Sequence, residues 1–318
     1  MDLKANANSY LYELKQIWLS LHNIDNVFAY KLNVIKTKYL QGNEIIYMEY
    51  NPQRTRLRRL PQTISSLKPV FDEKAFNFKK IKSLELLMNI PYEGGAISMI
   101  INKSPLTRYH TLICPDVAAG QPQRLTLPAL RFCITFLLNI KDEEKAFRIG
   151  YNSPGALASV NHLHLHLLYV TTDLYSDKAE LELLERPNIY RLSEKMPTEA
   201  ICFLFNKTTD DEALNAQMQK LFNFINWLCE HNIPHNLFLT PNRSGNFEKV
   251  LKVFVFCRKS FCYVKDLNTY NIGFCEVAGY VTVGDENLYE RLTEQEVLAK
   301  IQNDTGDVFK EIYEYFKA

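Results

Sequence analysis

The sequence lacks an excess of charge of either sign, because 37 lysines and arginines stand against 36 aspartates and glutamates. A chain balanced in this way carries no broad field that would attract nucleic acid or an anionic membrane. We therefore expect neither nucleic acid nor a membrane as a partner. Any anion that the protein binds must be met by a local group of side chains.

Long apolar runs are also missing. No stretch reaches the roughly 18 uninterrupted apolar residues that a membrane helix needs, and charged residues interrupt the apolar positions of residues 1–23, unlike those of a signal peptide. The 7 cysteines are odd in number and include no C-x-x-C pair. They are typical of small buried side chains in a reducing compartment, so we expect a soluble cytoplasmic protein.

The composition is otherwise that of a globular protein, with 47% hydrophobic residues in a chain of 318 residues and no visible repeat or low-complexity linker. Apolar periodicity predicts helices over residues 9–21, 126–140, 210–230, 293–301 and 308–316. Apolar and β-branched runs predict strands over residues 96–102, 110–115, 145–151, 159–170, 201–205, 236–240, 250–257 and 274–283. This grouping predicts an α+β fold with a mainly antiparallel sheet and packed helices.

The N-terminal part reads differently from the rest. Residues 51–68 are rich in proline and arginine, which predicts an extended arm over the surface. Its arginines could neutralise the phosphate of a substrate or could belong to a solvated loop: Arg54, Arg56, Arg58 and Arg59. We therefore predict an N-terminal helix and extended arm over residues 1–80 and a larger domain, in one piece or two packed halves, over residues 81–318.

Three of the 7 histidines, His162, His164 and His166, recur at two-residue spacing within residues 159–170. Successive side chains of a strand point to opposite faces, so the histidines should share one face and the leucines between them the other. Such a face usually carries Thr, Val or Tyr rather than three titratable rings. The pattern predicts a row of imidazoles that serves a function.

A turn of small and polar residues, Asn152-Ser153-Pro154-Gly155, precedes this predicted strand. Residues of this kind can leave backbone N–H groups facing an anion. Asn152, Ser159 and Asn161 could add hydroxyl and amide donors to phosphate oxygens, or could bond only to their own neighbours. The stretch as a whole suits a phosphate group.

Clustered histidines serve three kinds of chemistry. A metal site usually adds another histidine or a carboxylate, yet no Asp or Glu follows the triad until Asp173. We therefore expect no metal and no cofactor. Nucleophilic catalysis needs one neutral imidazole, which adjacent imidazoles favour because they disfavour each other's protonation. A module that binds a nucleotide without turnover would need the same pocket.

The run His162-Leu163-His164-Leu165-His166-Leu167-Leu168 resembles the defining pattern of the histidine-triad superfamily, whose members transfer or hydrolyse nucleoside monophosphoryl groups. Residues 150–164 resemble one branch, the GDP-hexose phosphorylases, as do residues 58–64, 76–78, 102–106, 236–237 and 276–279. Plant members have Gln at the third triad position, so His166 favours the animal type. Tyr109 and Cys257 depart from the family pattern, which often has Gly and Pro there.

The resemblance implies a histidine-triad-like catalytic domain and phosphorolysis of GDP-D-glucose by inorganic phosphate, giving glucose 1-phosphate and GDP through a guanylyl-histidine. A nucleotide-sugar hydrolase and a nucleotide-binding protein without phosphorylase turnover are the alternatives. By the same likeness His164 is the nucleophile, His166 bonds to the phosphoryl group and the leaving oxygen, and His162 orients His164. Ser159 stands where relatives of the branch place a serine that contacts phosphate.

Overall fold

The computed structural model describes residues 2–43, 45–57, 60–185, 187–193, 198–242, 250–263, 265, 269–306 and 308–317. Its helices are α1 (Leu3–His22), α2 (Pro52–Leu57), α3 (Leu127–Asn139), α4 (Tyr175–Lys178), α5 (Asp211–Glu230), α6 (Glu286–Arg291), α7 (Glu294–Thr305) and α8 (Phe309–Lys317). Short 3₁₀ turns are η1 (Phe78–Lys80), η2 (Ser83–Glu85), η3 (Val117–Ala119), η4 (Asp142–Glu144) and η5 (Glu276–Ala278).

The strands of the first half are β1 (Lys36–Tyr39), β2 (Tyr47–Tyr50), β3 (Leu86–Tyr92), β4 (Gly95–Ile101), β5 (Thr111–Pro115), β6 (Phe147–Asn152) and β7 (Leu165–Tyr169). Those of the second half are β8 (Leu181–Glu185), β9 (Ile189–Leu192), β10 (Ile201–Asn206), β11 (His235–Pro241), β12 (Val250–Cys257) and β13 (Tyr280–Val283).

Within the described ranges, ten strands form one antiparallel sheet in the order β3-β4-β5-β7-β6-β11-β12-β10-β9-β8. Its two halves have the same topology: three strands in a meander, a long helix (α3 or α5), and two strands added in reverse order. The halves join where β6 pairs with β11. A second sheet, β1-β2-β13, brings the N-terminal and C-terminal parts of the chain together.

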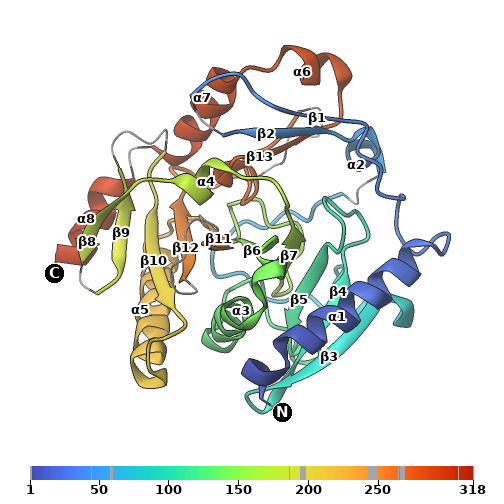
Figure 1. Cartoon of the computed structure of the whole chain (residues 1–318), viewed down its shortest axis with the longest axis horizontal. Coiled ribbons are helices and arrows are strands. Elements are labelled where there is room, and N and C mark those ends of the chain that lie inside the picture. The colour runs from blue at the N-terminus through green and yellow to red at the C-terminus, as the bar shows by residue number, and fades with distance from the viewer. Residues whose placement is uncertain are drawn as a thin grey trace.

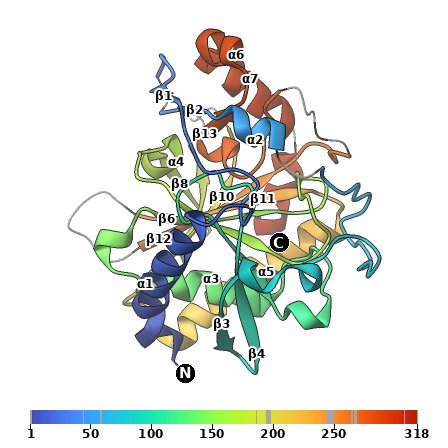
Figure 2. The ribbon, with the colours of Figure 1, turned by 90° about the vertical axis from the view of Figure 1, so that its right-hand side faces the viewer.

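Apolar cores lie on both faces of the large sheet. On one face α1, α3, α5 and α8 pack against side chains that include the leucines between the histidines, Leu163, Leu165 and Leu167. On the other face the small sheet, α6 and α7 pack against Leu168, Phe238 and Phe254. Figure 1 shows α6 and α7 beside the small sheet at the top of the molecule, and Figure 2 shows α1, α3 and α5 gathered on the opposite side. Such burial on both faces explains the near-continuous apolar strands.

Most predicted elements are confirmed. The α+β class with a mainly antiparallel sheet is correct, as is the buried leucine face of the histidine stretch. Helix α3 begins after its cap, Thr126, with a proline in its first turn, and α7 has the capping box of Thr293 and Glu296. None of the helices in the described part of the chain is long and apolar enough to cross a membrane.

Four boundaries were predicted wrongly. The first helix begins at Leu3 rather than at residue 9, because the Asp2 side chain caps it and Leu3 and Ala7 extend its buried face. Residues 51–68 are not extended throughout. They open with α2, because Pro52 suits a first helical position and the Asn51 side chain accepts the Arg54 N–H.

The strand predicted over residues 274–283 is reduced to β13, because η5 and Gly279, whose φ is 98°, turn the chain before Tyr280. The strand predicted over residues 159–170 begins only at Leu165. Before it, the N–H groups of Leu163 and His164 bond to Gln121 and Gln123 instead of a neighbouring strand. Twelve residues, 153–164, therefore separate β6 from β7, so the predicted turn at residues 152–155 does not lead directly into the histidine strand.

Candidate active site

The histidine cluster lies where β7 begins. The ring of His164 packs edge-on against the ring of His166, with 5.1 Å between centroids, and the Phe78 ring contacts both His162 and His164. His166 alone of the three lies on β7 and faces the small sheet. The prediction that all three histidines lie on one strand is therefore wrong, because His162 and His164 precede β7. The three rings nevertheless form a contiguous group.

His164 is held by the side-chain amide of Gln123, which bonds to its backbone, and by the carbonyl of His162, which bonds to its ring. Gln123 accepts the His164 N–H at 2.9 Å and donates to its carbonyl at 3.1 Å. The Nδ1 of His164 lies 2.8 Å from the carbonyl oxygen of His162, an acceptor, so Nδ1 carries the proton. In the neutral ring Nε2 then keeps its lone pair, which is the form that can attack an electrophile.

A fourth histidine, His110, fixes the state of His166. The Nδ1 of His110 accepts the Leu106 N–H at 2.9 Å, so a neutral His110 carries its proton on Nε2. That nitrogen lies 3.0 Å from Nδ1 of His166 and 3.1 Å from the amide nitrogen of Asn102. The Asn102 nitrogen cannot accept a proton, so the His110 N–H donates to His166. The proton of His166 must then be on its own Nε2. His166 is thus a hydrogen-bond donor at its free end, whereas His164 is an acceptor.

Three buried histidines of the cluster, His110, His162 and His166, are neutral. Burial, with the Lys79 charge adding to it, lowers the pKa of His162 to about 4. Burial also lowers the pKa of His110 and His166 well below the ordinary value, and neighbouring histidines and Arg54 lower it further. Near pH 7 these rings therefore act through hydrogen bonds rather than as cations.

A polar cavity of about 360 Å³ opens beside His166. It lies between the large sheet and the small sheet, and α2 and α6 border it. Its lining includes the positively charged side chains of Arg54, Arg56 and Lys265 and the carboxylates of Glu276 and Asp285. The positive side chains favour a phosphate-bearing ligand, the property that the sequence predicts for residues 51–59. Arg58 and Arg59 of that prediction lie outside the described residues.

The structure brings two of the three predicted donors to this cavity. Ser159 lines it and accepts a hydrogen bond from Lys265 at 2.6 Å. Asn152 also lines it, with its Oδ1 accepting from the Asn236 amide at 2.6 Å and from the Phe274 N–H at 3.0 Å. Asn152 therefore ties the first half of the sheet to the second, at the floor of the cavity.

Asn161 is not among the residues that line this cavity. Its side chain accepts the Gln123 N–H at 3.0 Å and donates to the carbonyl of Val70 at 2.7 Å, while its backbone N–H donates to Gln62. These bonds fasten the arm and the 121–123 segment to the histidine loop. A substrate contact for Asn161 stays a prediction.

A second cavity of about 360 Å³ borders the end of α2 at Leu57 and is lined mainly by apolar side chains. Phe78, which contacts the rings of His162 and His164, forms part of its wall together with Phe76, Ile81 and Leu57. The cluster is thus flanked by one polar and one apolar cavity. A nucleotide with a flat base and a charged end needs both kinds of surface.

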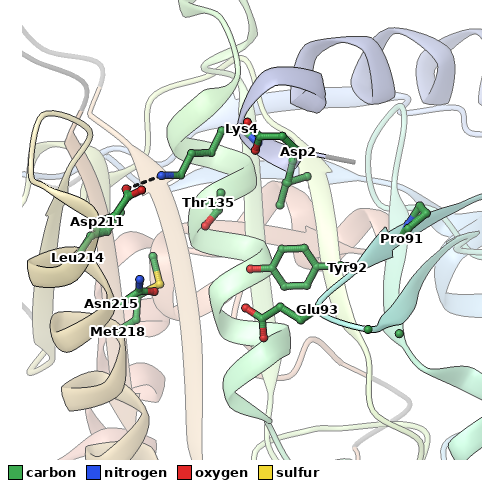
Figure 3. A pocket seen from close by; sticks show the side chains of 13 residues that line it. Asp2, Lys4, Pro91, Tyr92, Glu93, Thr135, Asp211, Leu214, Asn215 and Met218 are labelled. Atoms are coloured by element: carbon green, nitrogen blue, oxygen red, sulfur yellow. Dashed lines mark hydrogen bonds and ion pairs between the residues drawn. The ribbon is translucent and has the colours of Figure 1, made fainter.

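A larger cavity, of about 650 Å³, lies away from the histidines between the start of α1, the end of β3 and helices α3 and α5. Figure 3 shows Tyr92 and Glu93 projecting across α3, and the ion pair between Lys4 and Asp211 at its edge. Its described lining contains neither histidine nor cysteine. It therefore offers none of the nucleophilic chemistry that the triad predicts.

Sequence reasoning missed His110, Gln123, Phe78 and Glu276. His110 contacts His166 across 56 residues of chain, and Gln123 reaches His164 across 41, so no local spacing signals either pair.

Among the described residues, no group of three or more His, Cys, Asp or Glu side chains is arranged to hold a metal ion.

Tyr109, the first departure from the family pattern, has a φ of 61°. This left-handed conformation favours Gly, which explains why glycine is frequent at that position. The Tyr109 ring is buried and packs against Trp18, Phe147 and Tyr169. Aromatic packing therefore offsets the backbone strain beside His110.

Solved structures show which fold this is. The chain shares the fold of the yeast Ap4A phosphorylase Apa2, solved in complex with Ap4A, with a TM-score of 0.63 over 94% of this chain and 98% of that one, at 14% identity. Residues 13–168 match the model of the GDPGP1-like N-terminal domain family.

Sequence relatives decide the family. The chain is 34% identical to GDP-D-glucose phosphorylase 1 of Homo sapiens over 292 residues, which cover 87% of this chain and 74% of that protein. It is 35% identical to GDP-D-glucose phosphorylase 1 of Danio rerio, covering 91% of this chain and 84% of that protein. The chain belongs to the GDP-D-glucose phosphorylase family. The resemblance that the triad and its flanks indicate is thereby confirmed.

A more distant plant relative places the chain within the wider group. GDP-L-galactose phosphorylase 1 of Arabidopsis thaliana is 26% identical over 67% of this chain and 51% of its own length. The GDP-D-glucose phosphorylase family is therefore the nearer of these two branches, as the histidine at position 166 favours.

Proposed function

We propose that this chain catalyses the phosphorolysis of GDP-D-glucose to glucose 1-phosphate and GDP. Its membership of the GDP-D-glucose phosphorylase family supports the reaction. The observation that carries the proposal is the pair of hydrogen bonds at the Nδ1 atoms of His164 and His166: in the neutral rings they leave His164 with an unprotonated Nε2 and His166 with a protonated one. An acceptor beside a donor is what attack on phosphorus and departure of an oxygen require.

In the first step, Nε2 of His164 attacks the α-phosphorus of GDP-glucose. A P–N bond forms, and the bond from that phosphorus to the bridging oxygen breaks, so that glucose 1-phosphate leaves with the electron pair. His166 donates a hydrogen bond through Nε2–H to the oxygen that gains charge. His162 orients the nucleophile through its carbonyl oxygen.

In the second step, inorganic phosphate attacks the same phosphorus and expels His164, giving GDP. One pocket can hold either the departing sugar phosphate or the incoming phosphate opposite the same imidazole. The polar cavity supports this assignment because Arg54, Arg56 and Ser159 line it with His166. Phosphate and hexose phosphate would then bind there in turn.

The base would occupy the apolar cavity that Leu57 and Phe78 line. Phe78 lines that cavity and contacts the His164 ring, so a nucleoside there would place its 5′-phosphate close to the nucleophile. Aromatic and aliphatic walls suit the faces of a purine.

The test is to incubate the protein with GDP-glucose in the presence and absence of phosphate and to separate the products. Glucose 1-phosphate and GDP, formed in equal amounts and only with phosphate, are expected. Release of GMP and glucose 1-phosphate without phosphate would instead identify a nucleotide-sugar hydrolase. Nucleotide binding with no product would identify a binding protein. A panel of ADP- and UDP-glucose and of other GDP-hexoses, scored by the sugar phosphate released, tests the base and the sugar.

A further inference from the structure

Glu276 is a carboxylate in the polar cavity to which the proposed chemistry gives no task. It begins η5, immediately after the segment that carries Phe274, and lines the same cavity as His166. The Phe274 ring lies 5.0 Å from the His166 ring. Glu276 therefore lies two residues after Phe274, whose ring contacts His166, the residue proposed to face the leaving oxygen.

The backbone holds the Glu276 carboxylate in place. Oε2 accepts the N–H of Gly273 at 2.9 Å. A Cβ built on Gly273 would lie 3.3 Å from that oxygen and 3.5 Å from Oδ1 of Asn152, so this position leaves little room for a side chain. The absence of a side chain at Gly273 lets the carboxylate and the Asn152 amide approach the same point of the cavity wall.

The surroundings of Glu276 favour a neutral ligand that donates hydrogen bonds. Arg54 and Lys265 act on the carboxylate by charge, but no lysine or arginine of the described residues makes an ion pair with it. The carboxylate accepts the backbone N–H groups of Gly273 and of Glu276 itself, and its roughly four lone-pair positions leave capacity for further donors. A carboxylate repels phosphate, so it does not belong to the part of the cavity that holds the phosphoryl groups. Sugar hydroxyls are neutral donors of the kind that this oxygen can accept.

We propose that Glu276 is the specificity-determining residue that accepts hydrogen bonds from hydroxyls of the hexose in the polar cavity. This inference rests on the proposed function, since it assigns the sugar to the cavity that His166 lines. The cationic side chains would hold the phosphate of glucose 1-phosphate, and Glu276 the ring attached to it. Inorganic phosphate, which has no sugar ring, would not use Glu276.

Measuring the two half-reactions separately distinguishes a role of Glu276 in binding the hexose from a role in the whole reaction. Release of glucose 1-phosphate from GDP-glucose involves the hexose, whereas exchange of labelled phosphate into GDP involves only the nucleotide and phosphate. A Glu276→Gln variant keeps an oxygen for the Gly273 N–H, so its fold should be retained. We expect kcat/KM for GDP-glucose to fall about tenfold or more, because a hydrogen bond to a charged acceptor is lost, with the GDP–phosphate exchange rate within about twofold of the unsubstituted protein.

Glu49→Gln is the matched control, because Glu49 is a buried carboxylate of β2 that does not line the polar cavity. It should leave both rates unchanged. Equal loss of both half-reactions in Glu276→Gln would overturn the proposal by placing Glu276 at the nucleotide or in the fold, and unchanged rates would overturn it outright. If the unsubstituted protein catalyses neither half-reaction, the proposed function itself has failed.

Discussion

Each imidazole of the triad has its Nδ1 bonded to a protein group, and that bond decides what Nε2 can do. Backbone groups fix the tautomers of His162 and His164, because Nδ1 of His162 accepts the Phe78 N–H at 3.0 Å and Nδ1 of His164 donates to the His162 carbonyl. The side chain of His110 fixes the tautomer of His166. A main-chain carbonyl thus fixes the tautomer of His164, and no side-chain substitution removes that group. The tautomer of His166 depends on the His110 side chain, which a substitution can remove.

His110 is accordingly a positioning residue. His110→Ala should lower kcat about a hundredfold, since His166 would lose the bond that keeps its proton on Nε2, with little change in KM. His110→Gln, whose amide can donate from a similar place, should recover part of the rate. Steady-state kinetics on GDP-glucose measure both effects. His22→Gln, at a half-buried histidine outside the cluster that stacks on Trp18, is the control. Equal losses in both His110 variants would contradict the positioning role.

Buried neutral histidines also make stability depend on pH. Burial lowers the pKa of His235 to about 4, so below its ordinary value of about 6.5 the unfolded chain takes up a proton that the folded chain does not. The stabilisation is present above about pH 6.5 and is lost as the pH falls toward 4. Glu49 and Glu276, whose pKa values burial raises, act in the opposite direction.

A comparison of two proteins therefore isolates the effect of His235. The unfolding free energy of a His235→Asn variant should fall less between pH 7 and pH 5 than that of the unsubstituted chain. Urea unfolding at each pH measures the two slopes. Identical slopes would show that His235 does not bind its proton differently in the folded and unfolded states.

At the scale of elements, β6 carries a glycine where the C-terminal segment crosses it. Gly150 pairs with His166 of β7, and a Cβ built on it would lie 1.9 Å from the Phe274 ring. This close approach seats Phe274 against His166. The strand could be predicted from its apolar residues, but the reason for its glycine could not, because the contact joins residues 124 positions apart.

Gly150→Ala should therefore destabilise the protein by about 1–3 kcal/mol through overpacking and should also slow turnover by displacing Phe274. Adding Phe274→Leu should recover part of the lost stability, since the smaller side chain makes room for the new methyl group. Denaturant unfolding of the two single variants and the double variant measures the coupling. Strictly additive losses would show that the two residues do not meet.

Local signals predicted the elements well where they depend on caps and periodicity. The helices predicted from residues 126, 210 and 293 begin there because the side chains of Thr126, Asp210 and Thr293 cap them. The histidine strand was predicted too long because its apolar alternation continues into Leu163, whose N–H bonds to Gln121 outside the sheet. Alternation reports which side chains are buried, not which backbone groups pair.

The whole molecule repeats one topology in its two halves, although no repeat is visible in the sequence. The strand that corresponds to β7 in the second half is β12, which has Lys252, Phe254 and Phe256 on the face toward the small sheet in place of histidines. One half therefore supplies the histidine cluster. The other contributes Asn236, Phe274 and Glu276 to the environment of the same cavity.

Long-range assembly explains what the sequence could not predict. The small sheet joins β2 to β13 across more than half of the chain, and the polar cavity forms only when it packs beside β7. The separation of residues 1–80 from residues 81–318 stays a prediction. The triad can be recognised in the sequence by its resemblance to a known family. His110 and the two cavities beside the triad become visible only in the three-dimensional structure.

The proposed reaction depends on a covalent bond between GMP and His164. The protein should be mixed with GDP-glucose in the absence of phosphate, digested under conditions that preserve P–N bonds, and its peptides mapped by mass. One guanylyl group per chain on the peptide containing His164, with an equal amount of glucose 1-phosphate released, is the predicted result, and a folded His164→Asn variant should show neither. A guanylyl group on another residue, or undiminished turnover in His164→Asn, would contradict it.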